Sequence, residues 1–463
     1  MSIAVRTAAS RRPRRLTVAA IAIATLVSAS FVVATTGVAS AGPPRLVEDI
    51  NPTGDSSPFD LTNVRGTVFF AATADGTPQT YFELWKSDGT EDGTRRVRRT
   101  GYTDAQDLTR VGRRVFYNAE VGNTGFELWV SDGTRKGTRR VEDIFPGPTE
   151  SNPAWLANVG GVLFFSAEGP TGGRELWRSD GTPAGTKRVA DINPAGDSNP
   201  EYLTNVGGAL FFRANDGTNG VELWTSDGSR RGTELVKDID PAGSSSPTSL
   251  MNVDGRAFFS AVDPTAGREL WLSDGSKKGT KRVLDINPGG DSNPTEMAVM
   301  GRTLFFRAND GVTGAELWKS NGKAAGTVLV EDIYPTGDSA PYDLTNVGGT
   351  LFLFATVNGV NADLWKSDGT EAGTVSVADL GGGVTFASNL TNVKGRVYFA
   401  NNPADGRDTQ LWISDGTAAG TRQLKAINPT DHAFPSQLTR VGRTLFFSAD
   451  DGTHGVELFK RGR

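Results

Sequence analysis

Short apolar runs alternate with polar, glycine-rich segments along the chain from about residue 45 onward. Four such runs fill residues 201–239: EYLTNV (Glu201–Val206), ALFFRAN (Ala209–Asn215), VELWTS (Val221–Ser226) and TELVKDI (Thr233–Ile239). Each run has the length of a β-strand, and no window shows the 3.6-residue period of an amphipathic helix. Only two glycines separate the first two runs, a spacing typical of a hairpin. The pattern predicts a four-stranded antiparallel sheet and almost no helix.

Both faces of this predicted sheet are apolar. In the second run Leu210 and Phe212 face one way and Phe211 faces the other, because side chains alternate along a strand. Leu223 and Trp224 do the same in the third run. A sheet that is apolar on both faces must lie between two others, and stacking such sheets around an axis produces a β-propeller.

The unit is repeated along the chain. The motif Glu-Leu-Trp or a close variant places its aromatic residue at Trp85, Trp129, Trp177, Trp224, Trp271, Trp318, Trp365, Trp412 and Phe459. The intervals are 44 and 48 residues, and then 47 residues six times. A period near 47 excludes short-period solenoids and indicates one four-stranded blade per repeat.

The two ends of the repeat region predict how the ring closes. RLVEDI (Arg45–Ile50) is a lone fourth strand, whereas the last repeat stops after its third strand, VELFK (Val456–Lys460). We therefore expect the first segment to complete the last blade, which leaves no open sheet edge. Two smaller propellers or an open array are the alternatives, but no linker divides the repeats. The fold class predicted is a single all-β propeller of nine blades.

Residues 1–41 differ in kind from the repeats and predict a secretory signal peptide. Five arginines between Arg6 and Arg15 precede an apolar segment, Leu16–Ala34, and the small residues Ala39-Ser40-Ala41 form a cleavage motif. The mature domain would then span residues 42–463, secreted or at the cell surface. The alternative is an uncleaved membrane anchor, since the apolar segment is about as long as a spanning helix.

Several repeats share a longer motif. ELWKSDGTEDGT (Glu83–Thr94), ELWRSDGTPAGT (Glu175–Thr186) and DLWKSDGTEAGT (Asp363–Thr374) resemble the ELWxxDGT repeat family of secreted bacterial proteins. The resemblance covers the repeat region and departs from the family pattern at Asn321, Gln410 and Phe459. It implies an extracellular repeat protein. It implies no catalytic residue, because the family is defined by its repeat.

Composition narrows the choice of partners. Removing the five leader arginines from the 48 basic residues leaves 43 against 53 acidic residues, a net charge of −10. An acidic chain is a poor ligand for nucleic acid or for anionic membranes. The absence of cysteine excludes disulfides and thiolate chemistry.

Acidic residues recur in the segments that join one repeat to the next. A first aspartate precedes an isoleucine and a second follows a glycine turn, as in DINPTGDS from Asp49. Carboxylates and carbonyls around such a turn are oxygen ligands suited to calcium. Aspartates that only fix the turn are the alternative. The calcium candidates are Asp49, Asp55, Asp191, Asp197, Asp285, Asp291, Asp332 and Asp338.

The only two histidines, His432 and His454, interrupt the repeat near its end and are expected on one face of the ring. With Asp431, Asp450 and Asp451 beside them, they are candidates to bind a ligand or transition metal, or to act as acid and base. Drift on an exposed loop is the alternative. The repeated glutamates and tryptophans are interpreted as architecture, because a catalytic site needs different residues in different roles.

The function predicted is a non-enzymatic binding or scaffold module for an extracellular protein or glycan. A ring of near-identical polar loops suits multivalent capture. We expect a monomer without nucleic-acid partners, with calcium as the one candidate cofactor and membrane contact only through a retained leader. The alternatives are a hydrolase with its site near His432 and His454, and a structural component of the cell envelope.

Overall fold

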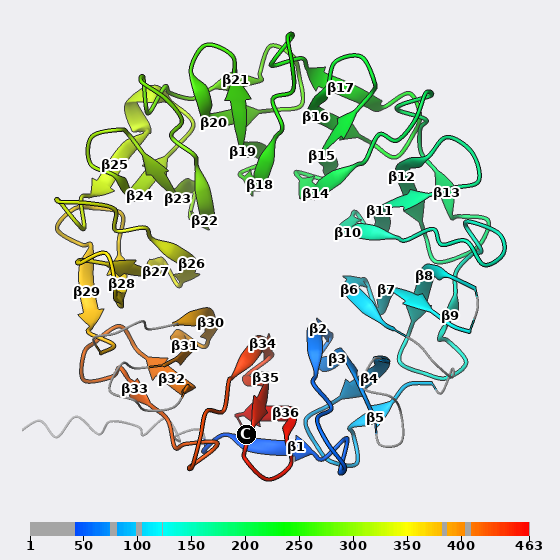
Figure 1. Cartoon of the computed structure of the whole chain (residues 1–463), viewed down its shortest axis with the longest axis vertical. Helices are drawn as coiled ribbons and strands as arrows, with labels where there is room; N and C mark the ends of the chain where they lie inside the picture. The colour runs from blue at the N-terminus through cyan, green and yellow to red at the C-terminus, as the bar shows by residue number, and fades with distance from the viewer. Residues whose placement is uncertain are drawn as a thin grey trace, which may run out of the picture. The chain divides into compact units, whose positions relative to one another are not determined.

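The chain folds into a ring of nine four-stranded sheets (Figure 1). The computed structural model describes residues 42–74, 81–98, 104–122, 124–381, 387–402 and 409–462, all within one compact unit. The predicted leader, residues 1–41, lies outside the described residues. Within them the one helical element is a single 3₁₀ turn, η1 (Ala324–Gly326). The prediction of a single nine-bladed propeller is confirmed, and the two-propeller and open-array alternatives are excluded.

Each blade places its first strand nearest the axis and its fourth at the rim (Figure 1). The first strands are β2 (Phe59–Val64), β6 (Gln106–Val111), β10 (Ala154–Val159), β14 (Glu201–Val206), β18 (Thr248–Val253), β22 (Thr295–Met300), β26 (Tyr342–Val347), β30 (Ser388–Val393) and β34 (Ser436–Val441). The second strands are β3 (Thr67–Ala72), β7 (Arg114–Glu120), β11 (Val162–Glu168), β15 (Ala209–Asn215), β19 (Arg256–Asp263), β23 (Thr303–Asn309), β27 (Thr350–Thr356), β31 (Arg396–Asn401) and β35 (Thr444–Asp450). We number the blades 1 to 9 in this order.

The third strands carry the Glu-Leu-Trp motif, and the fourth strands follow them. The third strands are β4 (Glu83–Ser87), β8 (Phe126–Ser131), β12 (Arg174–Ser179), β16 (Val221–Ser226), β20 (Gly267–Ser273), β24 (Ala315–Ser320), β28 (Ala362–Ser367), β32 (Gln410–Ser414) and β36 (Val456–Arg461). The fourth strands are β5 (Arg95–Arg96), β9 (Arg139–Arg140), β13 (Lys187–Arg188), β17 (Thr233–Lys237), β21 (Lys281–Arg282), β25 (Val328–Glu331), β29 (Val375–Ala378), β33 (Arg422–Gln423) and, in blade 9, β1 (Arg45–Glu48).

The fourth strands are shorter than the sequence pattern predicted. The run Thr233–Ile239 contributes only five residues to β17, and five blades have a fourth strand of two residues. In those blades the chain makes one more backbone bond, such as Val189 N to Leu176 O at 2.8 Å, and then leaves the sheet. The residues that follow form the loop to the next blade, and in three of these blades a buried glutamate accepts their N–H groups.

The first and last segments of the described chain meet in blade 9, as predicted. β1 pairs antiparallel with β36, opposing Arg45 to Lys460 and Leu46 to Phe459. Thr439 Oγ1 in β34 donates a hydrogen bond to Leu61 O of blade 1 at 3.3 Å. Thr62 Oγ1 donates in the same way to the next blade, to Leu108 O at 2.9 Å. The seam of the ring therefore has the same contacts as a continuous interface.

The core consists of layers between neighbouring blades. Leu210 and Phe212 of blade 4 pack with Val189 and other residues of blade 3. Phe211, on the other face of the same strand, packs with Phe259 of blade 5. The prediction that both faces of each sheet are apolar is confirmed, and burial of both faces is what holds adjacent blades together.

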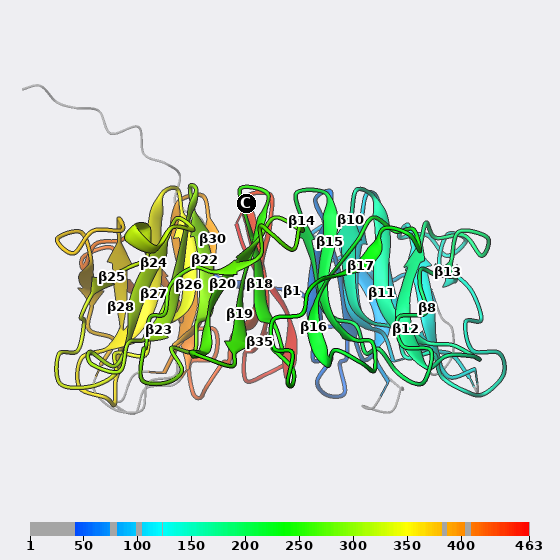
Figure 2. The same cartoon turned by 90° about the horizontal axis from the view of Figure 1, so that it is seen from above.

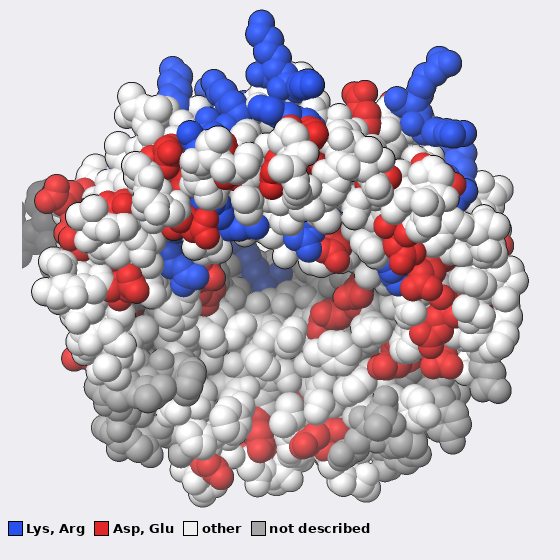
Figure 3. Space-filling model, turned by 45° about the horizontal axis from the view of Figure 1, so that its top comes forward, with Lys and Arg blue, Asp and Glu red and all other residues white. Residues whose placement is uncertain are grey.

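Every first strand carries a β-bulge at its second residue. These residues have positive φ angles, and the register of the first and second strands shifts there in each blade. They lie at the same end of the innermost strands, so they form a ring around the opening at the axis, which is visible as a hollow in Figure 3. We call this set the channel-mouth ring: Asp60, Asp107, Trp155, Tyr202, Ser249, Glu296, Asp343, Asn389 and Gln437.

Candidate functional site

The two faces of the ring carry different loops, seen edge-on in Figure 2. One face has the hairpins between first and second strands and the Asp-Gly-Thr turns. The other has the loops between second and third strands and the loops between blades, and we call it the loop face. In blade 3 these two kinds of loop touch, since Ser198 N donates to Arg174 O at 3.0 Å. Both kinds of loop therefore lie on one surface, as the sequence predicted.

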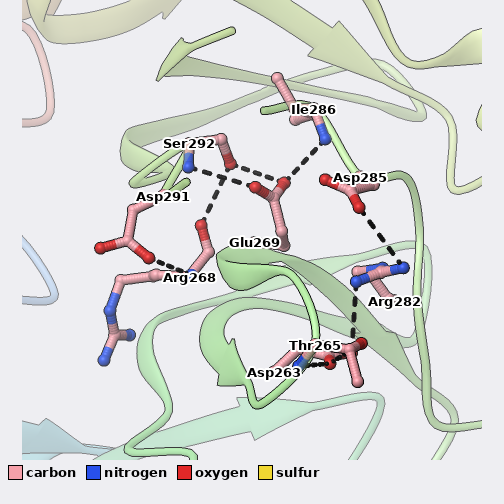
Figure 4. A network of polar contacts seen from close by, with 9 residues as sticks. All are labelled: Asp263, Thr265, Arg268, Glu269, Arg282, Asp285, Ile286, Asp291 and Ser292. Atoms are coloured by element: carbon pink, nitrogen blue, oxygen red, sulfur yellow. Dashed lines mark hydrogen bonds and ion pairs between the residues drawn. The ribbon is translucent and has the colours of Figure 1, made fainter. Parts of the chain in front are cut away.

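A buried glutamate organises the interblade loop in six of the nine blades. Glu269 in β20 is fully buried and accepts three hydrogen bonds (Figure 4): from Ile286 N at 2.9 Å, from Ser292 N at 3.1 Å and from Ser292 Oγ at 2.7 Å. Burial raises the pKa of Glu269, although these hydrogen bonds oppose the rise. Equivalent bonds to the isoleucine and serine of the following loop are made by Glu127, Glu175, Glu222, Glu316 and Glu457.

Two blades build a similar loop without a glutamate. In blade 7 Asp363 accepts a hydrogen bond from Leu380 N at 3.3 Å. In blade 8 the neutral Gln410 accepts from Ile427 N at 3.0 Å and donates to Asn428 O at 2.8 Å. Because an amide replaces the acid in the same geometry, the position serves the loop's backbone. This gives the repeated glutamates a structural role.

The calcium candidates fall into two positions with different partners. The first aspartates lie near the fourth strand, and two bond to arginine: Asp191 Oδ2 is 3.3 Å from Arg188 and Asp285 Oδ2 is 3.7 Å from Arg282 (Figure 4). Oδ1 is buried without a hydrogen-bond partner in Asp49, Asp191, Asp285 and Asp332.

The second aspartates accept a backbone N–H at the start of the third strand. Asp197 Oδ1 accepts from Arg174 N at 2.8 Å and Asp291 Oδ1 from Arg268 N at 2.6 Å. Asp55 accepts from Val456 N at 2.8 Å, and Asp338 accepts from Ala315 N at 2.7 Å. These bonds join each interblade loop to the loop beside it.

The loops offer calcium some of the ligands that it needs. Each pair of aspartates has one orphaned buried oxygen, from the first acid, and that atom fits a cation. Over the described ranges, however, no three His, Cys, Asp or Glu side chains gather in the way a metal site requires. Calcium prefers six to eight oxygens, so carbonyl groups and water would have to supply the others. Calcium binding stays a prediction.

His432 occupies the position of a second aspartate. Its Nδ1 accepts a hydrogen bond from Thr409 N at 2.7 Å, which is the bond that Asp197 makes in blade 3. Nδ1 thus takes the acceptor role that the carboxylate oxygen of Asp197 has in blade 3. The histidine replaces the carboxylate without changing the loop.

A groove of about 490 Å³ opens beside His432 on the loop face. Phe434 stands in its wall with 61% of its surface exposed, and its ring stacks on the imidazole of His432 at a centroid distance of 5.0 Å. Ser388, Asn389 and Thr409 also line it. The groove thus combines one apolar ring with hydroxyl, amide and imidazole groups, a composition suited to binding a polar ligand.

His454 belongs to the neighbouring loop of blade 9 and has partners of its own. Its Nδ1 lies 2.9 Å from Asp451 Oδ2, and this hydrogen bond raises the pKa of His454 above its usual value. Asp450 accepts from Gly452 N at 2.6 Å, and Asp431 accepts from His432 N at 2.7 Å. The five predicted binding residues share one face, but only His432 lines the groove.

Three aromatic residues at the surface were not among the sequence-based candidates: Phe434 and Trp155, which are exposed, and Tyr202, which is half-buried. Trp155 is 43% exposed and stacks on Tyr202 with ring centroids 4.7 Å apart. A position-by-position comparison of repeats could have found them. Phe434 replaces the small or amide residue that precedes a proline in other blades, and Trp155 and Tyr202 occupy the bulge position that is mostly polar elsewhere.

Comparison with known proteins identifies no family for this chain. No family model matches the chain, and no curated protein matches it. Among solved structures, the computationally designed Ika8 protein is similar at 14% identity and a TM-score of 0.46, covering 80% of this chain and 99% of its own.

Two hydrolase structures are also similar. Puromycin hydrolase aligns at 15% identity and a TM-score of 0.38, over 74% of this chain and 58% of its own. A structure from a study of two prolyl endopeptidases aligns at 15% and 0.41, over 76% and 53%. This chain thus spans little more than half the length of either hydrolase, and likenesses this weak transfer no activity.

In the part of the chain that the structure covers, no helix is long and apolar enough to span a membrane.

Proposed function

We propose that this chain is a secreted, non-enzymatic binding or scaffold propeller that presents its loop face to an extracellular protein or glycan. The observation that carries the proposal is the groove at blades 8 and 9, where Phe434 is exposed in a wall of polar groups. Gln410 holds the loop that carries His432 and Phe434 through its bonds to Ile427 N and Asn428 O, and a loop fixed in this way loses less conformational entropy when a ligand binds.

The exposure of Phe434 is not required by the fold. Its φ angle is +43°, a left-handed conformation that is uncommon for a bulky residue. Six other blades make the same turn, at φ angles between +43° and +47°, with small or amide residues: Ser57, Asn152, Asn199, Ser246, Asn293 and Ala340. An aromatic ring that the turn does not need, placed at the surface beside hydrogen-bonding groups, supports a role in binding.

The repeat itself supplies the variants for a test. Phe434→Ser copies blade 4 and removes the exposed ring. His432→Asp copies blade 3 and preserves the bond to Thr409 N. We would measure both variants of the full chain against arrays of extracellular glycans and proteins, with the melting temperature as the control for folding.

We expect Phe434→Ser to lower affinity by about tenfold for the ligand that the unaltered chain selects, because one buried aromatic contact is lost. His432→Asp should bind with an unchanged or modestly lower affinity. If Phe434→Ser bound this ligand as tightly as the unaltered chain does, the groove would not be the binding site. A hydrolytic turnover abolished by replacing His432 and His454 with alanine would support the hydrolase alternative instead.

A further inference from the structure

The channel-mouth ring is polar except at two adjacent positions. Seven of its nine members are acids, amides or a serine, and the aromatic pair comes from blades 3 and 4, on the neighbouring innermost strands β10 and β14 (Figure 1). This pair lies on other blades than the groove at Phe434, so it is a separate feature of the loop face.

Trp155 is held in place on one side and open on the other. Its indole packs on the ring of Tyr202, with centroids 4.7 Å apart and planes inclined by 33°. The guanidinium of Arg213 also lies over the Tyr202 ring, 4.7 Å from its centroid, and Arg213 Nε bonds to Glu201 Oε2 at 2.9 Å. The stack is therefore anchored by an ion pair, while 43% of the surface of Trp155 stays exposed.

The fold does not require aromatic residues here. Trp155 and Tyr202 have φ angles of +56° and +55°, and Ser249 makes the same bulge at +54° in the next blade. Of the nine tryptophans, eight lie on third strands in the core, and Trp155 alone is exposed. A large ring kept at the surface, in a backbone conformation that bulky residues rarely adopt, indicates selection for contact with a ligand.

Polar groups surround this apolar surface. Asp107 is the ring member next to Trp155, in blade 2. The backbone N–H of Asp107 donates a hydrogen bond to Asp60 Oδ2 at 2.6 Å. Arg213 and Glu201, which hold the Tyr202 ring, also line a pocket of about 220 Å³ together with Asn199, Asn215 and Ser198. A ligand on the indole that extends past Tyr202 would thus find amide, hydroxyl, carboxylate and guanidinium groups.

We infer that Trp155, supported by Tyr202, is a stacking platform for a neutral pyranose sugar at the channel mouth between blades 3 and 4. A β-linked pyranose has a flat face of C–H groups and a rim of hydroxyls, which matches an exposed indole bordered by carboxylates and amides. A nucleobase has a similar shape, but it carries phosphates, and the channel-mouth ring contains four acids and no basic residue: Asp60, Asp107, Glu296 and Asp343. Like charges so placed disfavour an anionic ligand.

The test uses the full chain and cellohexaose, a neutral β-1,4-linked hexasaccharide. Because Trp155 is the exposed tryptophan, acrylamide should quench its emission first, and a bound sugar should shield it. We expect cellohexaose to shift the emission and reduce quenching in the unaltered chain. Trp155→Ser should lose this response and bind at least about tenfold more weakly, and Tyr202→Ser should weaken binding less. Trp155→Ser copies Ser249, so its melting temperature should change little, whereas Tyr202→Ser also removes a ring that packs against the core and should lower it more.

Phe434→Ser is the matched control, because it removes an exposed aromatic ring from the other site. It should bind cellohexaose as the unaltered chain does. No change in emission or quenching with millimolar cellohexaose would overturn the inference, and so would equal binding by Trp155→Ser. If Phe434→Ser lost the sugar while Trp155→Ser kept it, the platform would be refuted and the proposed function at the groove would stand.

Discussion

Blades 5 and 9 make the same hydrogen bonds, but only in blade 9 do these bonds join the two ends of the chain. In blade 5 Glu269 bonds to Ile286 and Ser292, which follow it by 17 and 23 residues. In blade 9 Glu457 bonds to Ile50 N at 3.1 Å and Ser56 Oγ at 2.6 Å, which precede it by 407 and 401 residues. A contact that shapes a loop in one blade closes the ring in the other.

The two glutamates differ in their electrostatic surroundings as well. Burial raises the pKa of both side chains, and it raises that of Glu457 to about 7, with a further contribution from nearby Asp49. The closing blade therefore has a proton equilibrium close to neutral pH. A repeat protein can therefore use the hydrogen bonds that shape its loops to hold its first and last strands together, without a new sequence motif. We call the bonds of Glu457 to Ile50 and Ser56 the latch.

The largest expected effect is that of replacing either glutamate with alanine. Both variants should lose stability, but they should differ in whether β1 is released. Both Glu269→Ala and Glu457→Ala leave buried N–H groups and a serine hydroxyl without an acceptor, so each should lower the free energy of unfolding by about 4 kcal/mol. Only Glu457→Ala should also release β1 and expose the edge of β36. Urea unfolding measures the first effect, and limited proteolysis near residues 42–56 measures the second.

Glutamine is the control for both positions, because Gln410 already holds the equivalent loop in blade 8. Glu269→Gln and Glu457→Gln should each lose less stability than the alanine variant. Equal protection of residues 42–56 in Glu457→Ala and Glu269→Ala would show that the pairing of β1 with β36 does not depend on the latch.

The second effect is a pH dependence carried by Glu457. Its pKa in the folded chain, about 7, exceeds the value near 4.5 in the unfolded chain, so the folded state binds the proton more tightly. The contribution to stability is complete below pH 4.5 and is lost as the pH rises through 7, by at most about 3 kcal/mol. The difference in unfolding free energy between the unaltered chain and Glu457→Gln, measured from pH 4 to 8, isolates this group. A difference that is constant over this range would contradict the assignment.

Calcium binding is tested at the first aspartates of the interblade loops, which are Asp285 after blade 5 and Asp49 after blade 9. If calcium binds the folded loops, a concentration tenfold above the dissociation constant should stabilise the chain by about 1.4 kcal/mol per occupied site. The measurement is a thermal melt with excess chelator and then with millimolar calcium. Aspartate-to-asparagine changes at Asp49, Asp191, Asp285 and Asp332 should abolish the shift. No shift in the unaltered chain would leave these acids as partners of the loop alone.

The repeat explains why the fold was predictable from sequence. A two-residue period in Leu210, Phe211 and Phe212, a glycine pair at a hairpin and a constant spacing of the tryptophans each report on local geometry, and the blades multiply that signal. Even the closure of the ring followed from strand counting, because a lone fourth strand at Arg45 and a missing one after Lys460 leave one arrangement that removes both edges.

The candidate sites were less predictable, because they depend on single departures from the repeat. His432 stood out as a rare residue type, yet its main bond is one that aspartate makes elsewhere. Trp155 and Phe434 belong to a class of residue that is normally buried, yet both are exposed, at positions where the backbone is left-handed. A pattern of apolar residues carries no sign of that conformation.

The smallest effect concerns His454, which in blade 9 takes the position of Asn219 in blade 4. The bond to Asp451 raises the pKa of His454, so its contribution to stability is present below the unfolded value of 6.5 and is lost as the pH rises through the higher folded value. Asn219 in blade 4 makes the same bond to Asp216, at 2.7 Å, without titrating. His454→Asn should therefore change stability by less than about 0.5 kcal/mol and remove the titration. Histidine NMR signals of the two proteins identify the resonance that disappears. Its midpoint should lie above 6.5, and a midpoint at or below that value would mean that Asp451 positions the loop through backbone bonds alone.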